Sequence, residues 1–225
     1  MNARFFFNTG KFALLLALSA PLHIFSQTTQ FASQPGSKVR IEGTSSIHDW
    51  QIEGNVIGGT LEAGPNFPTD PAQTIQPGKV DAKVSAFITV RSLKSVEKDG
   101  KPYSDSMDGI TYEKLLQTSY PRIVYRLSEL VLKEVPKTAG APYIFDSQGE
   151  LAVAGVTNKI SMPVNVTLMP DKKVKISGKT SVKMTDFKIQ PPAPTLGLGL
   201  IKTGDEVKVS FEWIIAQKAA PAAGR

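Results

Sequence analysis

The sequence predicts a single antiparallel β-barrel domain, and three observations lead to this fold class. Long stretches of the chain alternate apolar and polar residues with a period of two, the pattern of strands with one buried and one solvated face. About eight such stretches follow one another, a number that closes a barrel around side chains or one small ligand. Helical spacing is rare, so we expect only one or two short helices beside the strands.

The clearest strand runs from Val174 to Met184, where apolar or small residues alternate with lysine and serine. A slip of one residue in its pairing would expose the whole apolar set, so the pattern also fixes which side faces the core. We therefore expect one set inside and the other in solvent: Val174, Ile176 and Val182 against Lys175, Lys179 and Lys183.

Similar alternation predicts the remaining strands. They are Val80–Val90, Ile160–Leu168 and Val207–Trp213, with shorter candidates at Lys38–Gly43, Ile47–Glu53, Arg122–Leu130 and Tyr143–Ala154. One helix is expected around Met107 to Leu116, and it ends before Pro121 because the residue before a proline avoids the α region. Two irregular stretches rich in proline and glycine, 64–78 and 191–204, are expected as loops at the barrel rim.

The N-terminal segment has the features of a signal peptide. Arg4 and Lys11 precede an uncharged apolar run that ends before Ser26, and that run is too short to span a membrane. We expect cleavage near Ser26 and export to a bacterial periplasm. The expected organisation is then a signal peptide at 1–26, a flexible lead-in at 27–37, one barrel domain at 38–217 and a disordered tail at 218–225.

Composition limits the function further. Hydrophobic residues make up 41% of the chain and charged residues 20%, which is ordinary for a globular core. The absence of cysteine excludes disulfides and a lipoprotein anchor. Loss of residues 1–26 would lower the formal net charge from +6 to +4, and the basic residues are dispersed, so nucleic acid is not an expected partner. No later segment is long and apolar enough for an integral membrane helix.

Residues for catalysis are scarce. After signal removal His48 is the one remaining histidine, and Asp49 beside it in a strand would point to the opposite face. Asp105 and Asp108 are expected in an exposed polar loop, and no spacing indicates a metal site. We therefore expect no catalytic residue, no metal, no cofactor and no enzymatic activity.

The most unusual short stretch is Gly43–Trp50, GTSSIHDW. In one interpretation His48 and Trp50 share a face near the barrel mouth and contact the polar head of a ligand. In the other, which we favour, the Ser and Asp side chains bind nearby amides in a turn, and Trp50 plugs an end of the barrel.

Over residues 38–217 the chain resembles the YceI-like, polyisoprenoid-binding family. The resemblance depends on the order of several segments. They are Gly43–Trp50, Ile88–Val90 with Ser92-Leu93, Met107-Asp108, Tyr112, Leu115-Leu116, Tyr120–Tyr125, Gly149–Leu151 with Gly155–Asn158, Lys183–Ile189, and Gly204–Val207.

The resemblance implies a lipocalin-like, eight-stranded barrel that carries a polyisoprenoid, such as an isoprenoid quinone, in the periplasm without enzymatic activity. Alternation places one set of residues on the dry faces of the strands, and we expect these to line a tunnel for one long apolar ligand: Val84, Ala86, Ile88, Ile123, Tyr125, Leu127, Leu151, Val153, Val164, Val166, Ile176, Val182, Phe211 and Trp213. The helix near Tyr112–Leu116 and the loop Pro191–Leu200 would cover the opening, and Tyr125 would offer its hydroxyl to a head group.

Two other classes of protein fit the same alternation. A barrel whose apolar residues fill the core would hold no ligand and would serve as a stress-response or interaction module. An outer-membrane barrel would turn its apolar side to lipid, but the lysines would then crowd a narrow lumen, and no aromatic girdles are evident. The sequence leaves the ligand and the choice between monomer and dimer open.

Overall fold

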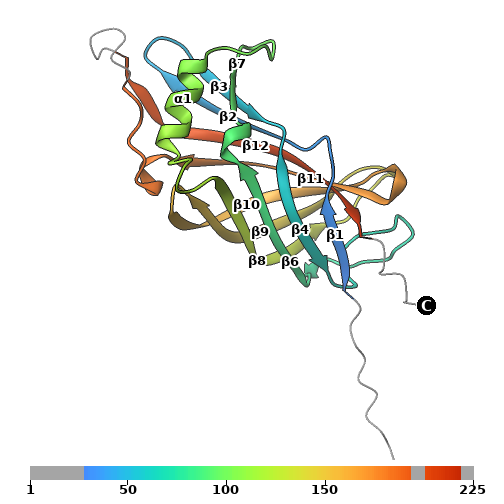
Figure 1. Cartoon of the computed structure of the whole chain (residues 1–225). Helices are drawn as coiled ribbons and strands as arrows, with labels where there is room; N and C mark the ends of the chain where they lie inside the picture. The colour runs from blue at the N-terminus through green and yellow to red at the C-terminus, as the bar shows by residue number, and fades with distance from the viewer. Residues whose placement is uncertain (1–27, 194–200, 219–225) are drawn as a thin grey trace, which may run out of the picture.

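The structure, a computed structural model, describes residues 28–193 and 201–218. Eight antiparallel strands form a closed barrel in which each strand pairs with the next and β12 pairs back onto β1 (Figure 1). In order around the barrel they are β1 (Thr29–Ser33), β4 (Ile57–Ala63), β6 (Ala82–Thr89), β8 (Arg122–Glu134), β9 (Tyr143–Val153), β10 (Val156–Leu168), β11 (Lys173–Lys183) and β12 (Thr203–Gln217). The predicted fold class is confirmed.

A smaller group of strands extends the sheet at one end of the barrel. From β12 it continues through β2, β3 and β7, and the short β5 pairs with β8. The bounds are β2 (Lys38–Ser45), β3 (Trp50–Gly54), β5 (Gly78–Lys79) and β7 (Lys94–Val96). Helix α1 (Asp105–Lys114) lies at this same end (Figure 1). Three 3-10 turns complete the described chain: η1 (Val90–Ser92), η2 (Pro170–Lys172) and η3 (Thr185–Phe187).

The apolar side of the strands faces the barrel interior, as the alternation predicts. In β11, Val174 and Ile176 are buried, and Lys179 and Lys183 are exposed. Val182 and Lys175 are half-buried. This arrangement is the opposite of an outer-membrane barrel, whose apolar side faces lipid.

The end of the barrel opposite α1 is closed by side chains. Phe67, from the loop at 64–77, is 1% exposed and contacts Phe31 and Phe145 at centroid distances of 6.2 Å each. Ile75 from the same loop is also buried. The prolines of this loop therefore accompany a segment that packs against the core across the barrel end, which agrees with its expected place at the rim.

Four details of the sequence-based assignment need correction. The expected flexible lead-in at 27–37 is wrong for Thr29–Ser33, which forms β1 between β4 and β12. Strand β4 was not predicted either, nor were the short strands β5 and β7. The strand predicted at Val80–Val90 is shorter, Ala82–Thr89, because Val90 already belongs to a 3-10 turn and its amide hydrogen-bonds to the carbonyl oxygen of Pro121 at 3.0 Å. The strand predicted at Ile47 begins only at Trp50, since Ser45 organises a turn before it.

The expected signal peptide at 1–26 and most of the expected tail at 218–225 lie outside the described residues, so both stay predictions. Within residues 28–193 and 201–218, no helix combines the length and apolar character needed to cross a membrane. The loop expected at 191–204 is described only at its two ends.

Candidate ligand-binding site

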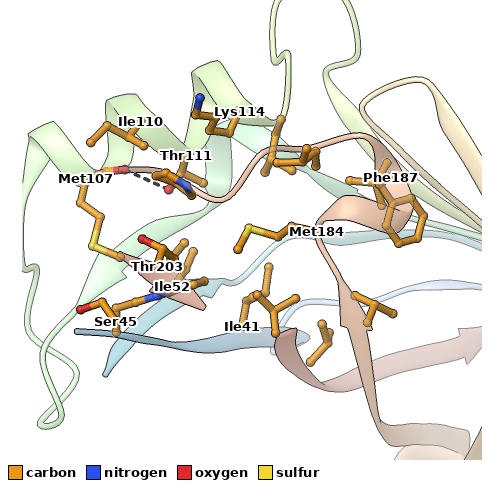
Figure 2. A pocket seen from close by; sticks show the side chains of 18 of the residues that line it. Ile41, Ser45, Ile52, Met107, Ile110, Thr111, Lys114, Met184, Phe187 and Thr203 are labelled. Atoms are coloured by element: carbon orange, nitrogen blue, oxygen red, sulfur yellow. Dashed lines mark hydrogen bonds between the residues drawn. The ribbon is translucent and has the colours of Figure 1, made fainter. Parts of the chain in front are cut away.

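A cavity of about 380 Å³ lies between α1 and the ends of the barrel strands (Figure 2). Helix α1 supplies one wall through Met107, Ile110 and Thr111. Strands β2 and β3 supply another wall through Ile41 and Ile52. We call this space the outer chamber. Its lining is mostly aliphatic, and its volume falls within the range of small-molecule sites.

A second cavity of about 140 Å³ lies deeper in the barrel, and we call it the deep chamber. It extends to Phe67 and Trp213 near the closed end. Both chambers are lined by the same ring of four side chains, which marks where they adjoin: Ile88, Ile123, Leu151 and Val209. An apolar path therefore runs from the α1 end toward the closed end.

The structure brings together all fourteen wall residues predicted from the sequence. Twelve of them line the deep chamber: Val84, Ala86, Ile88, Ile123, Tyr125, Leu127, Leu151, Val164, Val166, Ile176, Phe211 and Trp213. The other two, Val153 and Val182, line the outer chamber. Whether these residues bind a ligand stays a prediction, but alternation alone placed them on one connected surface.

Glycines set the width of the deep chamber by admitting aromatic rings. A Cβ atom at Gly149 would lie 2.6 Å from the Tyr125 hydroxyl oxygen, and one at Gly178 would lie 2.9 Å from the Phe211 ring. Contacts this short do not occur, so each ring occupies space that a side chain on the facing strand would otherwise fill. The rings of Tyr125 and Phe211 therefore narrow the deep chamber at the two glycines, where the missing side chains would otherwise leave it wide.

The deep chamber contains one pair of hydrogen-bonded hydroxyls. The Tyr125 and Ser147 oxygens are 2.6 Å apart, and Ser147 is buried. Burial raises the pKa of the Tyr125 phenol, and its hydrogen bond to Ser147 opposes that shift. Tyr125 thus stays protonated and already uses its hydroxyl within the wall. This weakens the expectation that it is free to bind a head group.

In the Gly43–Trp50 segment the Ser45 side chain binds nearby backbone groups in a turn, as the structural interpretation predicts for serine. Trp50 is half-buried in the lining of the outer chamber, so the expectation that it plugs an end of the barrel is not met. The amide of His48 donates to Ser45 Oγ at 3.2 Å, and Ser45 Oγ donates to the His48 carbonyl oxygen at 2.7 Å. Trp50 Nε1 donates to the carbonyl oxygen of Thr44 at 3.2 Å, and its ring lies where a Cβ on Gly43 would be, 2.1 Å from Trp50 Cζ2. Glycine at 43 is needed for this packing.

His48 and Trp50 also lie at the mouth of the outer chamber, as the other interpretation requires. His48 Nδ1 is 2.8 Å from the carbonyl oxygen of Asp49, so it donates there, and Nε2 accepts from the Tyr103 hydroxyl at 3.2 Å. Both ring nitrogens are thus engaged in local structure. Among the described residues no group of three or more His, Cys, Asp or Glu side chains is arranged to hold a metal ion.

Asp108 fastens α1 to β7, which corrects its expected place in an exposed loop. It is 6% exposed and accepts hydrogen bonds from Lys94 Nζ at 2.8 Å and from the Ser95 amide at 2.6 Å. Burial acts to raise the pKa of Asp108, but the hydrogen bonds from Lys94 and Ser95 outweigh it and hold the pKa below its usual range. Tyr112 adds a hydrogen bond of 2.9 Å from its hydroxyl to the carbonyl oxygen of Leu93.

Much of the outer chamber was not identified from the sequence. Among its lining residues, Ile41, Ile52 and Val209 lie in predicted strands but were not named as wall residues. A second group comes from α1, its C-cap and the segment around η3: Met107, Ile110, Thr111, Lys114, Leu115, Met184, Phe187 and Ile189. A period of two says nothing about helices and turns. The nearest signal was the predicted helix itself, which the sequence analysis placed over the opening without naming its lining residues.

The fold and the chambers define a small closed β-barrel with an apolar interior that is reached from the α1 end. The family model of the YceI-like domain matches residues 37–214, so the chain belongs to the YceI-like family. This confirms the family that the sequence motifs indicated. No curated protein sequence matches the chain.

Two solved structures share the fold at low sequence identity. One is a polyisoprenoid binding domain from Saccharophagus degradans implicated in plant cell wall breakdown, with a TM-score of 0.61 at 13% identity, covering 85% of this chain and all of that one. The other is BcnA from Burkholderia cenocepacia, with a TM-score of 0.54 at 16% identity, covering 79% of this chain and 95% of that one. At these identities the likeness is one of fold.

Proposed function

We propose that this protein is an exported, periplasmic lipid-binding protein that holds one long apolar ligand of the polyisoprenoid type inside the barrel, for carriage or sequestration. The observation that carries the proposal is the pair of adjoining apolar chambers, which extend from α1 to Phe67. The family and the fold shared with a polyisoprenoid binding domain support the same ligand class.

The energetics of such a ligand match the lining. An isoprenoid tail has no hydrogen-bonding groups, so a dry wall of aliphatic and aromatic side chains satisfies it. Each five-carbon unit would contribute roughly 3–4 kcal/mol, at about 0.8 kcal/mol per buried CH₂-sized group, before the cost of ordering the tail. The two chambers therefore provide affinity through contact area, with no need for a charged group or a reaction.

The proposal involves binding without catalysis. The His48 ring is hydrogen-bonded to Asp49 and Tyr103, and the Asp108 carboxylate is hydrogen-bonded to Lys94 and Ser95. These side chains, the most reactive candidates from the sequence, have structural partners. We therefore assign the protein no reaction and no cofactor.

Mass spectrometry of organic extracts from the purified, exported protein tests the ligand. We expect a stoichiometric polyisoprenoid-type lipid in the wild type and none in Val166→Asp, because Val166 is 1% exposed in the deep chamber and a carboxylate there would lose its water without gaining a partner. Thr167→Asp, at the next residue on the outer face, is the matched control and should retain the lipid. A wild type that never carries lipid would favour the ligand-free barrel.

Export has its own measurement. N-terminal sequencing of material from the periplasmic fraction should give a chain that begins at or near Gln27. Periplasmic protein that still begins at Met1 would contradict the predicted cleavage.

A further inference from the structure

Large exposed apolar side chains gather at the α1 end of the barrel. The described residues include six large exposed apolar side chains: Ile47, Val56, Tyr103, Leu116, Tyr120 and Val135. Four of them belong to this group; Val56, between β3 and β4, and Val135 do not. Ile47 lies between β2 and β3, Tyr103 precedes α1, and Leu116 and Tyr120 lie between α1 and β8. We call these four residues the rim. Val135 follows β8 at the opposite end of the barrel.

The rim is continuous with the outer chamber. Ile47 and Tyr103 are 64% and 44% exposed, yet both also line that chamber. The Tyr120 ring lies against Gly155 in the turn after Val153, another residue of the chamber wall. Exposed apolar side chains of the rim are therefore continuous with the apolar lining of the outer chamber.

Leu116 is the most unusual member of the rim. Its φ is +51°, in the left-handed region where the residue after a helix is usually glycine. The backbone there is held by a hydrogen bond of 2.9 Å from the Gln117 amide to the Tyr112 carbonyl oxygen. A leucine at this position strains the backbone, and because its side chain is 50% exposed, its burial contributes little to the stability of the fold. This combination points to a contact outside the molecule.

The charged residues of the chamber wall suit a lipid surface. They are Lys114 and Lys183, both basic, and Lys183 is exposed. Lysines beside apolar side chains can keep their ammonium groups among lipid head groups, and tyrosine is common at that depth.

We propose that the rim docks on the surface of a phospholipid bilayer, so that lipid passes directly between the bilayer and the outer chamber. The inference rests on the proposed function, because only a water-insoluble ligand needs this route. Docking inserts Ile47 and Leu116 into the apolar edge of the bilayer and leaves the barrel wall outside it.

Co-flotation of the full chain with vesicles of phosphatidylethanolamine and phosphatidylglycerol tests docking. We expect Ile47→Glu and Leu116→Gly each to lower the vesicle-bound fraction, corresponding to about a tenfold loss of affinity per apolar side chain removed. Val135→Glu, an equally drastic change at the far end, should bind as the wild type does. Leu116→Gly is the sharpest variant, because glycine relieves the backbone and should leave the melting temperature equal or higher.

Lipid loading is measured separately, by adding a fluorescent polyprenol from detergent and counting the label retained. Leu116 lines neither chamber, so Leu116→Gly should load as the wild type does but take polyprenol from vesicles about tenfold more slowly, since docking is the step it impairs. Wild-type protein that loads from detergent yet does not float with vesicles, or rim variants that float equally well, would overturn docking alone. Failure to load from detergent would instead refute the proposed function, and docking with it.

Discussion

Replacement of Ala86 by phenylalanine should shorten the lipid that the barrel accepts. Ala86 is a half-buried residue of β6, paired with Tyr125 of β8 and with Gly59 of β4, and it lines the deep chamber. A phenyl ring there would fill much of a space of about 140 Å³ and leave the outer chamber of about 380 Å³ unchanged. The variant would therefore lose at most about a quarter of the combined volume of the two chambers.

The expected change in affinity follows from the excluded part of the tail. If one five-carbon unit stays outside the deep chamber, the binding free energy loses roughly 3–4 kcal/mol of hydrophobic burial. Part of this loss is offset because that unit no longer has to be ordered. We expect a net loss of about tenfold to a hundredfold for ligands long enough to reach the deep chamber. Shorter ligands, which end in the outer chamber, should bind equally well to both proteins.

A length series of polyprenols, titrated against wild type and Ala86→Phe, provides the assay. Wild-type affinity should rise with each added unit until both chambers are full, and the variant should reach its plateau about one unit earlier. Ala152→Phe is the matched control, because Ala152 lies between two cavity-lining residues of β9 and so faces outward. Identical length dependence in wild type and Ala86→Phe would refute the assignment of the deep chamber as part of the site.

Three further predictions concern the structure around the mouth. Gly43→Ala should lower the free energy of unfolding by about 1–3 kcal/mol in urea denaturation, because the new Cβ would lie 2.1 Å from the Trp50 ring; an unchanged midpoint would contradict this packing. The pKa of Asp108 is depressed in the folded state, so its contribution is present above the unfolded value of 3.8 and is lost as pH falls through the lower folded value; Asp108→Asn should flatten the pH dependence of stability below about pH 4, and a parallel curve would show that its link to Lys94 is not the cause. His48→Ala should leave the metal content, measured by plasma mass spectrometry, equal to that of the wild type, and loss of a stoichiometric metal would disprove the structural role.

The barrel strands with long alternation were predictable because their side chains divide cleanly between an apolar interior and solvent. In β10 and β11, tertiary packing and local pattern agree, so sequence alone located both the strands and the wall of the deep chamber. The same reasoning failed for β4, which contains Gly58 and Gly59. Gly58 makes room for the ring of Phe87 on β6, so glycine is favoured there by a neighbour that is distant in sequence.

The first strand was missed for a different reason. Residues Thr29–Ser33 are few, and only Phe31 is buried, so the segment carries almost no periodic signal. Its strand conformation comes from pairing with β4 and β12, both far along the chain. The motif at Gly43–Trp50 shows a third limit, since the sequence offered a binding role and a structural role, and the structure shows that one turn provides the local packing and also lies at the mouth.

Phe67, which closes the end of the barrel opposite α1, determines how a bound lipid would leave. Because the deep chamber ends at this buried side chain, a ligand bound as proposed would enter and leave by the same end, and its whole tail would have to be withdrawn before another could replace it. The residence time should therefore lengthen with each unit of the tail, while the rate of entry changes less. The end of the lipid that enters last would face outward, so any enzyme or acceptor that meets the loaded barrel would encounter that end first.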